Sequence, residues 1–261
     1  MRILFIGDII GKPGRRMVEH HLPRLQQEYS VDFTIANGEN AAGGFGLNRT
    51  SFRDLHQLGV DAFTLGNHTW ANKELLQFID GETHIVRPGN LSAKPLPGVG
   101  YQYYTVGSSE LLVANLIGRI FMEPAECPFA ALDNLWQEAH SRTPFIFLDF
   151  HAEATSEKMA LAWYADGRIS AMVGTHTHIQ TNDARVLPRG AGYITDAGMT
   201  GPRDSVLGVE KDIIIDKFIG RRSRRFEPAT GDLQFNGVLF ELAADGRCHT
   251  VEPINFWEQA L

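Results

Sequence analysis

The stretch Ile3-Leu4-Phe5-Ile6-Gly7-Asp8, near the amino terminus, decides the fold. Four consecutive apolar residues are typical of a buried strand, and here they end at a glycine followed by a carboxylate. The same order recurs further along, where Phe33 to Ala36 precedes Asn37-Gly38-Glu39-Asn40 and Ala62 to Leu65 precedes Gly66-Asn67-His68. Amphipathic stretches separate these short apolar runs. The pattern predicts strand–helix–strand units and a largely parallel sheet in the first half of the chain.

Beyond these three strands, the sequence predicts further helices and strands. Predicted helices span Met17 to Tyr29, Phe52 to Leu58, Leu75 to Ile79, Phe129 to His140, Met159 to Tyr164 and a segment around Ile213 to Ile219. Predicted strands span Tyr101 to Val106, Leu111 to Ile117, Phe145 to Leu148, Ile169 to Val173, Tyr193 to Thr195, Leu233 to Leu239 and Thr250 to Ile254. A single α/β domain over residues 1–261, built as a two-sheet sandwich flanked by helices, suits this order better than two separate domains.

The composition is that of an ordinary globular protein, with 43% hydrophobic and 21% charged residues, and it excludes disorder as the main state. The net charge of −7 predicts no general attraction to nucleic acid or to an anionic membrane. No apolar stretch is long enough to span a membrane. Cys127 and Cys248 belong to no CxxC or Cys/His motif of metal-site spacing. We therefore expect a cytoplasmic protein with a small-molecule partner, and a homo-oligomer stays open.

Side chains that bind metals follow five of the predicted strands. They are Asp8, Glu39 with Asn40, Asn67 with His68, His151, and the pair His176 and His178. The carboxyl ends of parallel strands lie at one edge of a sheet, where ligands usually bind. Each motif alone has an ordinary explanation, such as a helix cap for a carboxylate or a buried, hydrogen-bonded imidazole for a histidine. These explanations do not account for five consecutive strand ends that each supply a ligand.

Carboxylate, carboxamide and imidazole groups together indicate a mixed nitrogen and oxygen site for manganese, iron, zinc or a similar ion. The lack of cysteine in the set argues against a structural zinc site of the thiolate type. About seven ligands exceed what one ion needs, so the pattern favours two ions that share a bridging carboxylate. Such a pair, about 3.5 to 4 Å apart, can hold a hydroxide between its ions and clamp the oxygens of a phosphoryl displacement.

Taken as an ordered set, these motifs resemble those of the calcineurin-like metallophosphoesterases. They resemble more closely the bacterial YmdB-like branch of that superfamily, whose members act on 2′,3′-cyclic nucleotides. The resemblance runs from Met1 to about Pro202. It includes the longer strings Gly38-Glu39-Asn40-Ala41-Ala42, Asp149-Phe150-His151-Ala152-Glu153-Ala154-Thr155-Ser156-Glu157-Lys158 and Thr195-Asp196-Ala197-Gly198-Met199-Thr200-Gly201-Pro202. The resemblance implies the α/β/β/α sandwich of the metallophosphoesterases.

The sequence departs from the broad superfamily in the way that the YmdB-like branch does. Ile10 stands where the first motif usually has histidine, Glu39 stands where the bridging residue is usually aspartate, and Thr69 replaces an acid after Asn67-His68. The resemblance implies two ions, iron or manganese first and zinc as an alternative. Their implied ligands are Asp8, Glu39, Asn40 and His178 for one ion, and Glu39, Asn67, His151 and His176 for the other. His68 is left as the proton donor, but without an acid at position 69 its orientation needs another partner.

The predicted function is hydrolysis of a small cyclic nucleotide of the 2′,3′-cyclic AMP type by a dinuclear-metal phosphodiesterase. In this mechanism a metal-bridging hydroxide attacks phosphorus and His68 protonates the departing alkoxide. One alternative is a regulatory scaffold in which the metals only rigidify the fold. A second is a nucleotide-binding module of the Rossmann type, which is disfavoured because Gly-x-Gly-x-x-Gly is missing after the first strand.

Two further features have both a functional and an ordinary interpretation. The basic run Arg221 to Arg225 could dock RNA phosphates, but a short basic stretch in an acidic protein is usually a solvated surface. Phe45, Trp70 and Trp163 could stack on a base, although scattered aromatic residues are more often part of the core.

Overall fold

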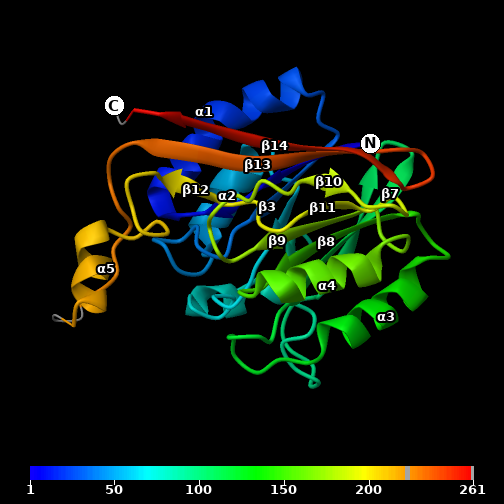
Figure 1. Ribbon diagram of the computed structural model, residues 1–261, viewed down its shortest axis with the longest axis horizontal. Helices are drawn as coiled ribbons and strands as arrows, with labels where there is room; N and C mark the ends of the chain where they lie inside the picture. Colours follow the sequence, from blue (N-terminus) through cyan, green and yellow to red (C-terminus); the bar gives the residue numbers. More distant parts are fainter. Residues whose placement is uncertain (221–223, 260–261) are drawn as a thin grey trace.

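The computed structural model describes residues 1–220 and 224–259, and within them two β-sheets pack face to face with helices on both outer faces (Figure 1). The strands of the first sheet are β1 (Arg2–Ile6), β2 (Asp8–Ile9), β3 (Phe33–Asn37), β4 (Ala62–Thr64), β5 (Ile85–Val86), β12 (Met199–Pro202), β13 (Leu233–Leu242) and β14 (Cys248–Glu258). Their order is β2-β12-β13-β1-β3-β4-β5, with β14 paired to β13. The predicted two-sheet α/β architecture is thus confirmed.

The second sheet has the order β10-β11-β9-β8-β7-β6. Its strands are β6 (Tyr101–Val106), β7 (Ser109–Ile117), β8 (Phe145–His151), β9 (Ala171–Thr175), β10 (Arg185–Val186) and β11 (Gly192–Ile194). Strands β7, β8, β9 and β11 are parallel, as are β1, β3, β4 and β5 in the first sheet. Antiparallel partners flank both parallel groups: β13 beside β1, and β6 and β10 at the two edges of the second sheet.

The helices are α1 (Gly11–Glu28), α2 (Arg49–Gln57), α3 (Pro128–Ala139), α4 (Thr155–Ala165) and α5 (Lys211–Phe218), with the short 3₁₀ helices η1 (Lys73–Gln77) and η2 (Ile79–Gly81). Helices α1 and α2 share one hydrophobic cluster with the first sheet, and α3 and α4 share another with the second. Helix α5 lies at one end of the molecule, at the left in Figure 1. None of the helices in the described ranges is long and apolar enough to cross a membrane.

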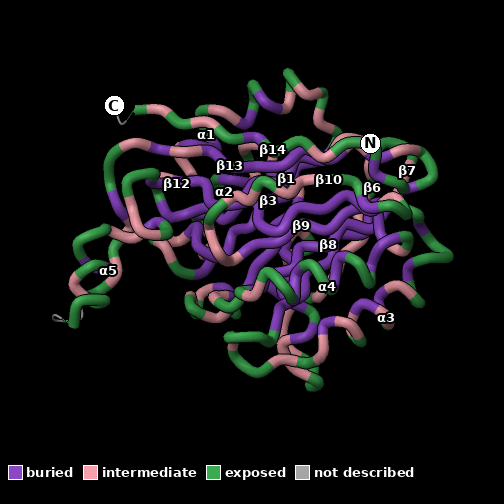
Figure 2. The backbone as a smooth tube through the Cα atoms, viewed as in Figure 1, coloured by how far each residue is buried: buried purple, intermediate pink, exposed green. Residues whose placement is uncertain are grey.

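Side chains alternate between the two faces of each strand, so one strand serves two cores. In β1, Ile3 and Phe5 point between the sheets, and Leu4 and Ile6 point toward the helices. The rings of Phe5 and Phe147 stack across the space between the sheets with their centroids 5.8 Å apart. Figure 2 shows this interior as buried, with exposed backbone mainly on the helices and loops.

Several predicted boundaries were wrong. Helix α1 begins at Gly11 and not at Met17, because its first turns are glycine-rich and carry no apolar periodicity. Gly14 is needed there, since a Cβ would lie 2.4 Å from the Thr200 carbonyl oxygen. The segment Leu75 to Ile79, predicted as one helix, belongs to the two short 3₁₀ helices η1 and η2. Phe78 separates them, because its φ of −141° is not helical.

In the second half, α4 begins at Thr155, four residues before the predicted start, and the strand predicted at Ile169 to Val173 lies at Ala171–Thr175. Ile169 instead forms an isolated bridge with Asp166. In the basic run Arg221 to Arg225, residues 221–223 lie outside the described residues.

A fully buried ion pair joins α4 to the loop before β12. Lys158 Nζ lies 2.7 Å from Asp196 Oδ2, and neither side chain is exposed to solvent. The same oxygen accepts hydrogen bonds from the Thr177 backbone N–H at 3.1 Å and from Thr177 Oγ1 at 2.8 Å. Asp196 therefore holds the turn that follows β9.

That turn carries His176 and His178, whose φ angles of 98° and 64° lie in the left-handed region. A non-glycine residue in a sparsely populated conformation costs about 1 to 3 kcal/mol and persists only where its surroundings fix it. The hydrogen bonds of Thr177 to the buried Asp196 supply this constraint.

We predict that Lys158→Met lowers the free energy of unfolding by about 3 to 5 kcal/mol, because it leaves the Asp196 carboxylate buried and without its cation. Urea unfolding of the purified variant measures this. The matched control is Arg247→Met, which breaks an exposed pair with Asp245 and should change stability by about 0.5 kcal/mol or less. Equal effects of the two substitutions would contradict a structural role for the buried pair.

Candidate metal centre

The eight predicted site residues converge at the edge of the sandwich where the parallel strands of both sheets end. Asp8 opens β2, Glu39 and Asn40 follow β3, and Asn67 and His68 follow β4 in the first sheet; His151 ends β8, and His176 and His178 follow β9 in the second. His151 lies four residues after Phe147 in β8, so both side chains leave the strand on the face that meets the first sheet. This periodicity brings the second sheet's histidines to the carboxylates of the first.

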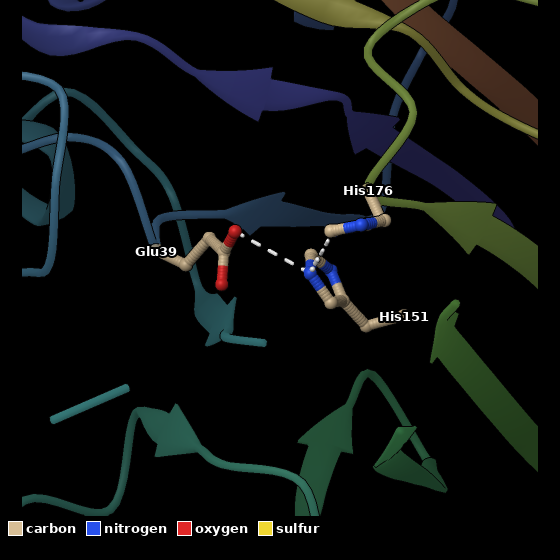
Figure 3. Close-up of side chains that lie close together, drawn as sticks. All are labelled: Glu39, His151 and His176. Carbon is tan, nitrogen blue, oxygen red and sulfur yellow. Dashed lines mark hydrogen bonds and ion pairs between the residues drawn. The ribbon is translucent and has the colours of Figure 1, made fainter. Parts of the chain in front are cut away.

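Three atoms with lone pairs surround one ring nitrogen of His151. Its Nε2 lies 2.8 Å from Asn67 Oδ1, 3.1 Å from His176 Nδ1 and 3.4 Å from Glu39 Oε1. Figure 3 shows the Glu39 carboxylate and the His176 ring directed at this nitrogen. A single proton cannot satisfy all of these contacts. The ligand atoms of Glu39, His151 and His176 all lie within 4.8 Å of one another, close enough for one cation to bind between them.

Neighbouring groups orient two of these histidines. Thr175 Oγ1 donates to Asp149 Oδ1 at 2.7 Å and so accepts from His151 Nδ1 at 2.9 Å, which leaves the Nε2 lone pair facing the site. His176 Nε2 lies 3.0 Å from Glu153 Oε2, which leaves its Nδ1 free in the same way. Partners that orient a ligand ring in this manner are typical of metal sites.

The ionisation of His151 and Glu39 also suits metal ligands. Burial lowers the pKa of His151 to about 4, so its imidazole is neutral near pH 7, the form that binds metals. Burial tends to raise the pKa of Glu39, but the hydrogen bonds and charge of His68 outweigh it and hold that pKa well below its usual range. Glu39 is therefore an anion although only 1% of it is exposed.

Asp8, Asn40 and His178 form a second group beside Glu39. His178 Nε2 lies 3.6 Å from Asp8 Oδ1 and 3.4 Å from Asn40 Nδ2, and His178 Nδ1 donates to the Leu207 carbonyl at 2.9 Å. Asp8 Oδ1 is buried and accepts no hydrogen bond from the described residues. A buried carboxylate oxygen in that state is costly unless a cation binds it.

The surroundings of His178 favour a positive charge. Burial alone would lower its pKa, but the charge of Asp8, 3.6 Å away, and the hydrogen bond to the Leu207 carbonyl raise the pKa to about 9. A metal ion bound at Nε2 would supply the same charge in place of the proton. The second group therefore also fits a cation.

Asn40 answers the question of how His68 is oriented. Asn40 Oδ1 accepts from His68 Nδ1 at 2.7 Å and takes the place of the acid missing at Thr69, whose hydroxyl donates to the Gly66 carbonyl. Asn40 Nδ2 donates to Glu39 Oε1 at 3.2 Å. Its amide oxygen thus points away from the other predicted ligands, and the amide must turn over before it can bind an ion through oxygen.

A cavity of about 400 Å³ opens over both groups. His68 lines it, with 30% of its side chain exposed. Burial lowers the pKa of His68, but the hydrogen bond and charge of Glu39 outweigh this effect and raise it. Thr175, Leu207 and the Lys158–Asp196 pair were not among the predicted site residues, because their contacts with the histidines depend on the packing of distant segments.

Comparison with known proteins places the chain among phosphodiesterases. Over 242 residues it is 52% identical to the 2′,3′-cyclic-nucleotide 2′-phosphodiesterase of Bacillus subtilis, covering 93% of this chain and 91% of the relative. It superposes on a hypothetical protein from Thermus thermophilus with a TM-score of 0.93 and 44% identity, over 99% and 100% of the two chains. It superposes on a novel phosphatase from Mycoplasma pneumoniae with a TM-score of 0.94 and 33% identity, over 99% of this chain and 94% of that one.

A more distant structure has a similar fold. A 5′-nucleotidase precursor from Thermus thermophilus superposes with a TM-score of 0.61 at 13% identity, over 99% of this chain and 54% of that one. The family model described as YmdB-like protein matches residues 4–254. Because this match spans nearly the whole chain, the chain belongs to the YmdB-like protein family.

Proposed function

We propose that this chain hydrolyses cyclic phosphodiesters of nucleotides, of the 2′,3′-cyclic AMP type, with two metal ions. It is an enzyme of the phosphoric ester hydrolase class, as its family and its Bacillus subtilis relative indicate. The observation that carries the proposal is the convergence of two adjacent ligand groups on Glu39 beneath one cavity. The substrate class is supported by the name of the relative.

The two ligand groups would hold the ions between them. Asn67, His151 and His176 with Glu39 would hold one; Asp8 and His178 with Glu39 would hold the other, while the Asn40 oxygen stays on His68 Nδ1. When bound, iron, manganese or zinc ions supply Lewis acidity to the phosphate and lower the pKa of the attacking water. The residues themselves fix the ions and place the phosphate at the floor of the cavity.

His68 is positioned to protonate the leaving alkoxide. Its Nδ1 is held by Asn40 Oδ1, and within the described residues its Nε2 makes no hydrogen bond. The exposed edge of the ring lies in the cavity beside the ligand groups. A side chain anchored at one nitrogen and free at the other can deliver a proton at a fixed place.

Reconstitution with metal tests this function. The chelated and dialysed protein should hydrolyse no ester, and adding Mn²⁺ or Fe²⁺ should restore hydrolysis. The restored enzyme should turn over 2′,3′-cyclic AMP faster than 3′,5′-cyclic AMP and simple monoesters. Full hydrolysis in excess chelator would rule out a metal mechanism. Bound metal without turnover of any ester would favour the regulatory scaffold.

We predict that Glu39→Gln lowers bound metal from about two ions per chain toward one. The substitution keeps the size of the side chain and removes the charge that both ligand groups face. Elemental analysis measures the metal, and phosphodiesterase turnover should fall steeply with it. Glu19→Gln, on the exposed surface of α1, is the control. A Glu39→Gln variant that retains two ions and near wild-type turnover would remove Glu39 from the bridging position.

We predict that His68→Ala retains both ions but lowers turnover of 2′,3′-cyclic AMP by about 10² to 10⁴-fold, because the alkoxide must leave without a proton. Turnover of an ester with a p-nitrophenolate leaving group should fall much less in this variant, since that group needs no protonation. His140→Ala, at the exposed end of α3, is the control. Loss of metal in His68→Ala, or equal losses on both esters, would exclude the role of proton donor.

A further inference from the structure

An apolar wall stands over the metal centre, formed by Phe45, Leu207, Phe218 and Phe226 around the cavity. Phe45 is 38% exposed, Leu207 44% and Phe218 81%, and Phe226 is half-buried. The floor of the same cavity is polar, since it consists of the ligand residues and His68. Apolar side chains left exposed together beside a polar floor are typical of a site that binds a ligand with an apolar part.

Leu207 occupies its place in the wall at a cost in backbone energy. Val206 and Val209 exchange backbone hydrogen bonds of 2.9 and 3.1 Å, so Leu207 and Gly208 are the two central residues of a tight turn. Their φ angles are 54° and 91°, the left-handed pair of a type I′ turn, for which asparagine and glycine are preferred. Leu207 is 44% exposed in a conformation that is unfavourable for leucine, so packing in the core does not explain its place.

The wall is fixed directly to the catalytic groups. The Leu207 carbonyl accepts the hydrogen bond from His178 Nδ1, and the Phe45 ring lies edge-to-face with His68 at a centroid distance of 4.9 Å. The Phe226 ring is within 17° of parallel to Phe45, with the centroids 6.3 Å apart. Two nearly parallel aromatic rings, Phe45 and then Phe226, therefore follow His68 outward from the polar floor.

The geometry of a 2′,3′-cyclic nucleotide matches this arrangement. Its base is attached to C1′, the neighbour of the C2′ atom that carries one of the reacting oxygens. With the phosphate on the floor, the planar base thus lies only a few covalent bonds from the oxygen that His68 would protonate. The cavity of about 400 Å³ suits one nucleotide. Lys217, whose Nζ lies 5.0 Å from the centre of the Phe226 ring, adds a positive charge that favours an anionic ligand.

We propose that this apolar wall is the nucleobase subsite, where the base of the substrate packs against Phe45, Phe226 and Leu207. This inference rests on the proposed function and adds the residues that recognise the nucleoside part. Of the other two predicted stacking residues, Trp70 packs against the hydrophobic core and Trp163 lies on α4 near Arg185, outside the cavity.

Two substrates test the subsite: 2′,3′-cyclic AMP, and the 2′,3′-cyclic phosphate of methyl riboside, which has the same strained ring and no base. Since stacking on an aromatic side chain strengthens binding about 10- to 100-fold, wild-type kcat/KM should favour the nucleotide by about that factor. Phe226→Ala should reduce the ratio of the two kcat/KM values about ten-fold, and Phe226→Tyr should restore it. Trp163→Ala, which removes an exposed aromatic residue outside the cavity, should leave the ratio unchanged.

Leu207→Asn separates ligand binding from stability. Asparagine tolerates the left-handed conformation, so the melting temperature should stay the same or rise, while the ratio falls several-fold because the apolar contact is lost. Equal kcat/KM values for the two substrates in the wild type, or an unchanged ratio in both Phe226→Ala and Leu207→Asn, would overturn the subsite and leave the phosphodiesterase intact. If the wild type hydrolysed neither substrate, the proposed function itself would fail.

Discussion

The structure depends on the unpaired lone pairs that meet at Nε2 of His151. A carboxylate oxygen, an amide oxygen and a second imidazole nitrogen all lie within 3.4 Å of that nitrogen, in a place where His151 itself is fully buried. Buried acceptors without donors are unfavourable, and most proteins avoid them. Here three acceptors face one ring nitrogen, and the buried Asp8 Oδ1 nearby accepts no hydrogen bond in the described ranges. The arrangement suits a site that binds cations.

Much of the remaining structure serves to hold these groups in place. Parallel strands bring ligands from both sheets to one edge, and the stacked apolar faces between the sheets set the distance across it. The left-handed His176 and His178 are held through Thr177 by Asp196, whose charge the buried Lys158 neutralises. A buried ion pair adds little net stability by itself, so its value here is the fixed position of the turn.

The sequence was sufficient to predict which residues meet at the candidate site but not which residues support them. Asp8, Glu39, Asn67 and His151 were predictable because each follows a short apolar run, and the end of a strand is a local property. Asp149 and Thr175 were not, because their role depends on β8 pairing in register with β9, which puts His151 opposite Thr175.

Segments of irregular backbone also could not be predicted from the sequence. Helix α1 begins in a glycine-rich turn that has no amphipathic pattern, and the Leu207 turn has a residue that turn preferences would exclude. Tertiary contacts act on the backbone in both places: a Cβ at Gly14 would lie 2.4 Å from the Thr200 carbonyl oxygen, and the turn at Leu207 presents its carbonyl to His178 Nδ1. Local propensity fails where the chain serves a site rather than its own element.

Asn40 and Glu39 link His68, the proposed proton donor, to the ligand groups. With Thr69 in place of an acid, His68 has a neutral amide partner at 2.7 Å, and the nearest carboxylate oxygen is Glu39 Oε1, 3.3 Å from its Nδ1. That oxygen also faces His151 and accepts from Asn40. One carboxylate thus contacts both the ligand groups and His68. A cation bound to Glu39 would compete for the charge that favours the protonated form of His68, so bound ions and His68 would be electrostatically coupled through a single side chain.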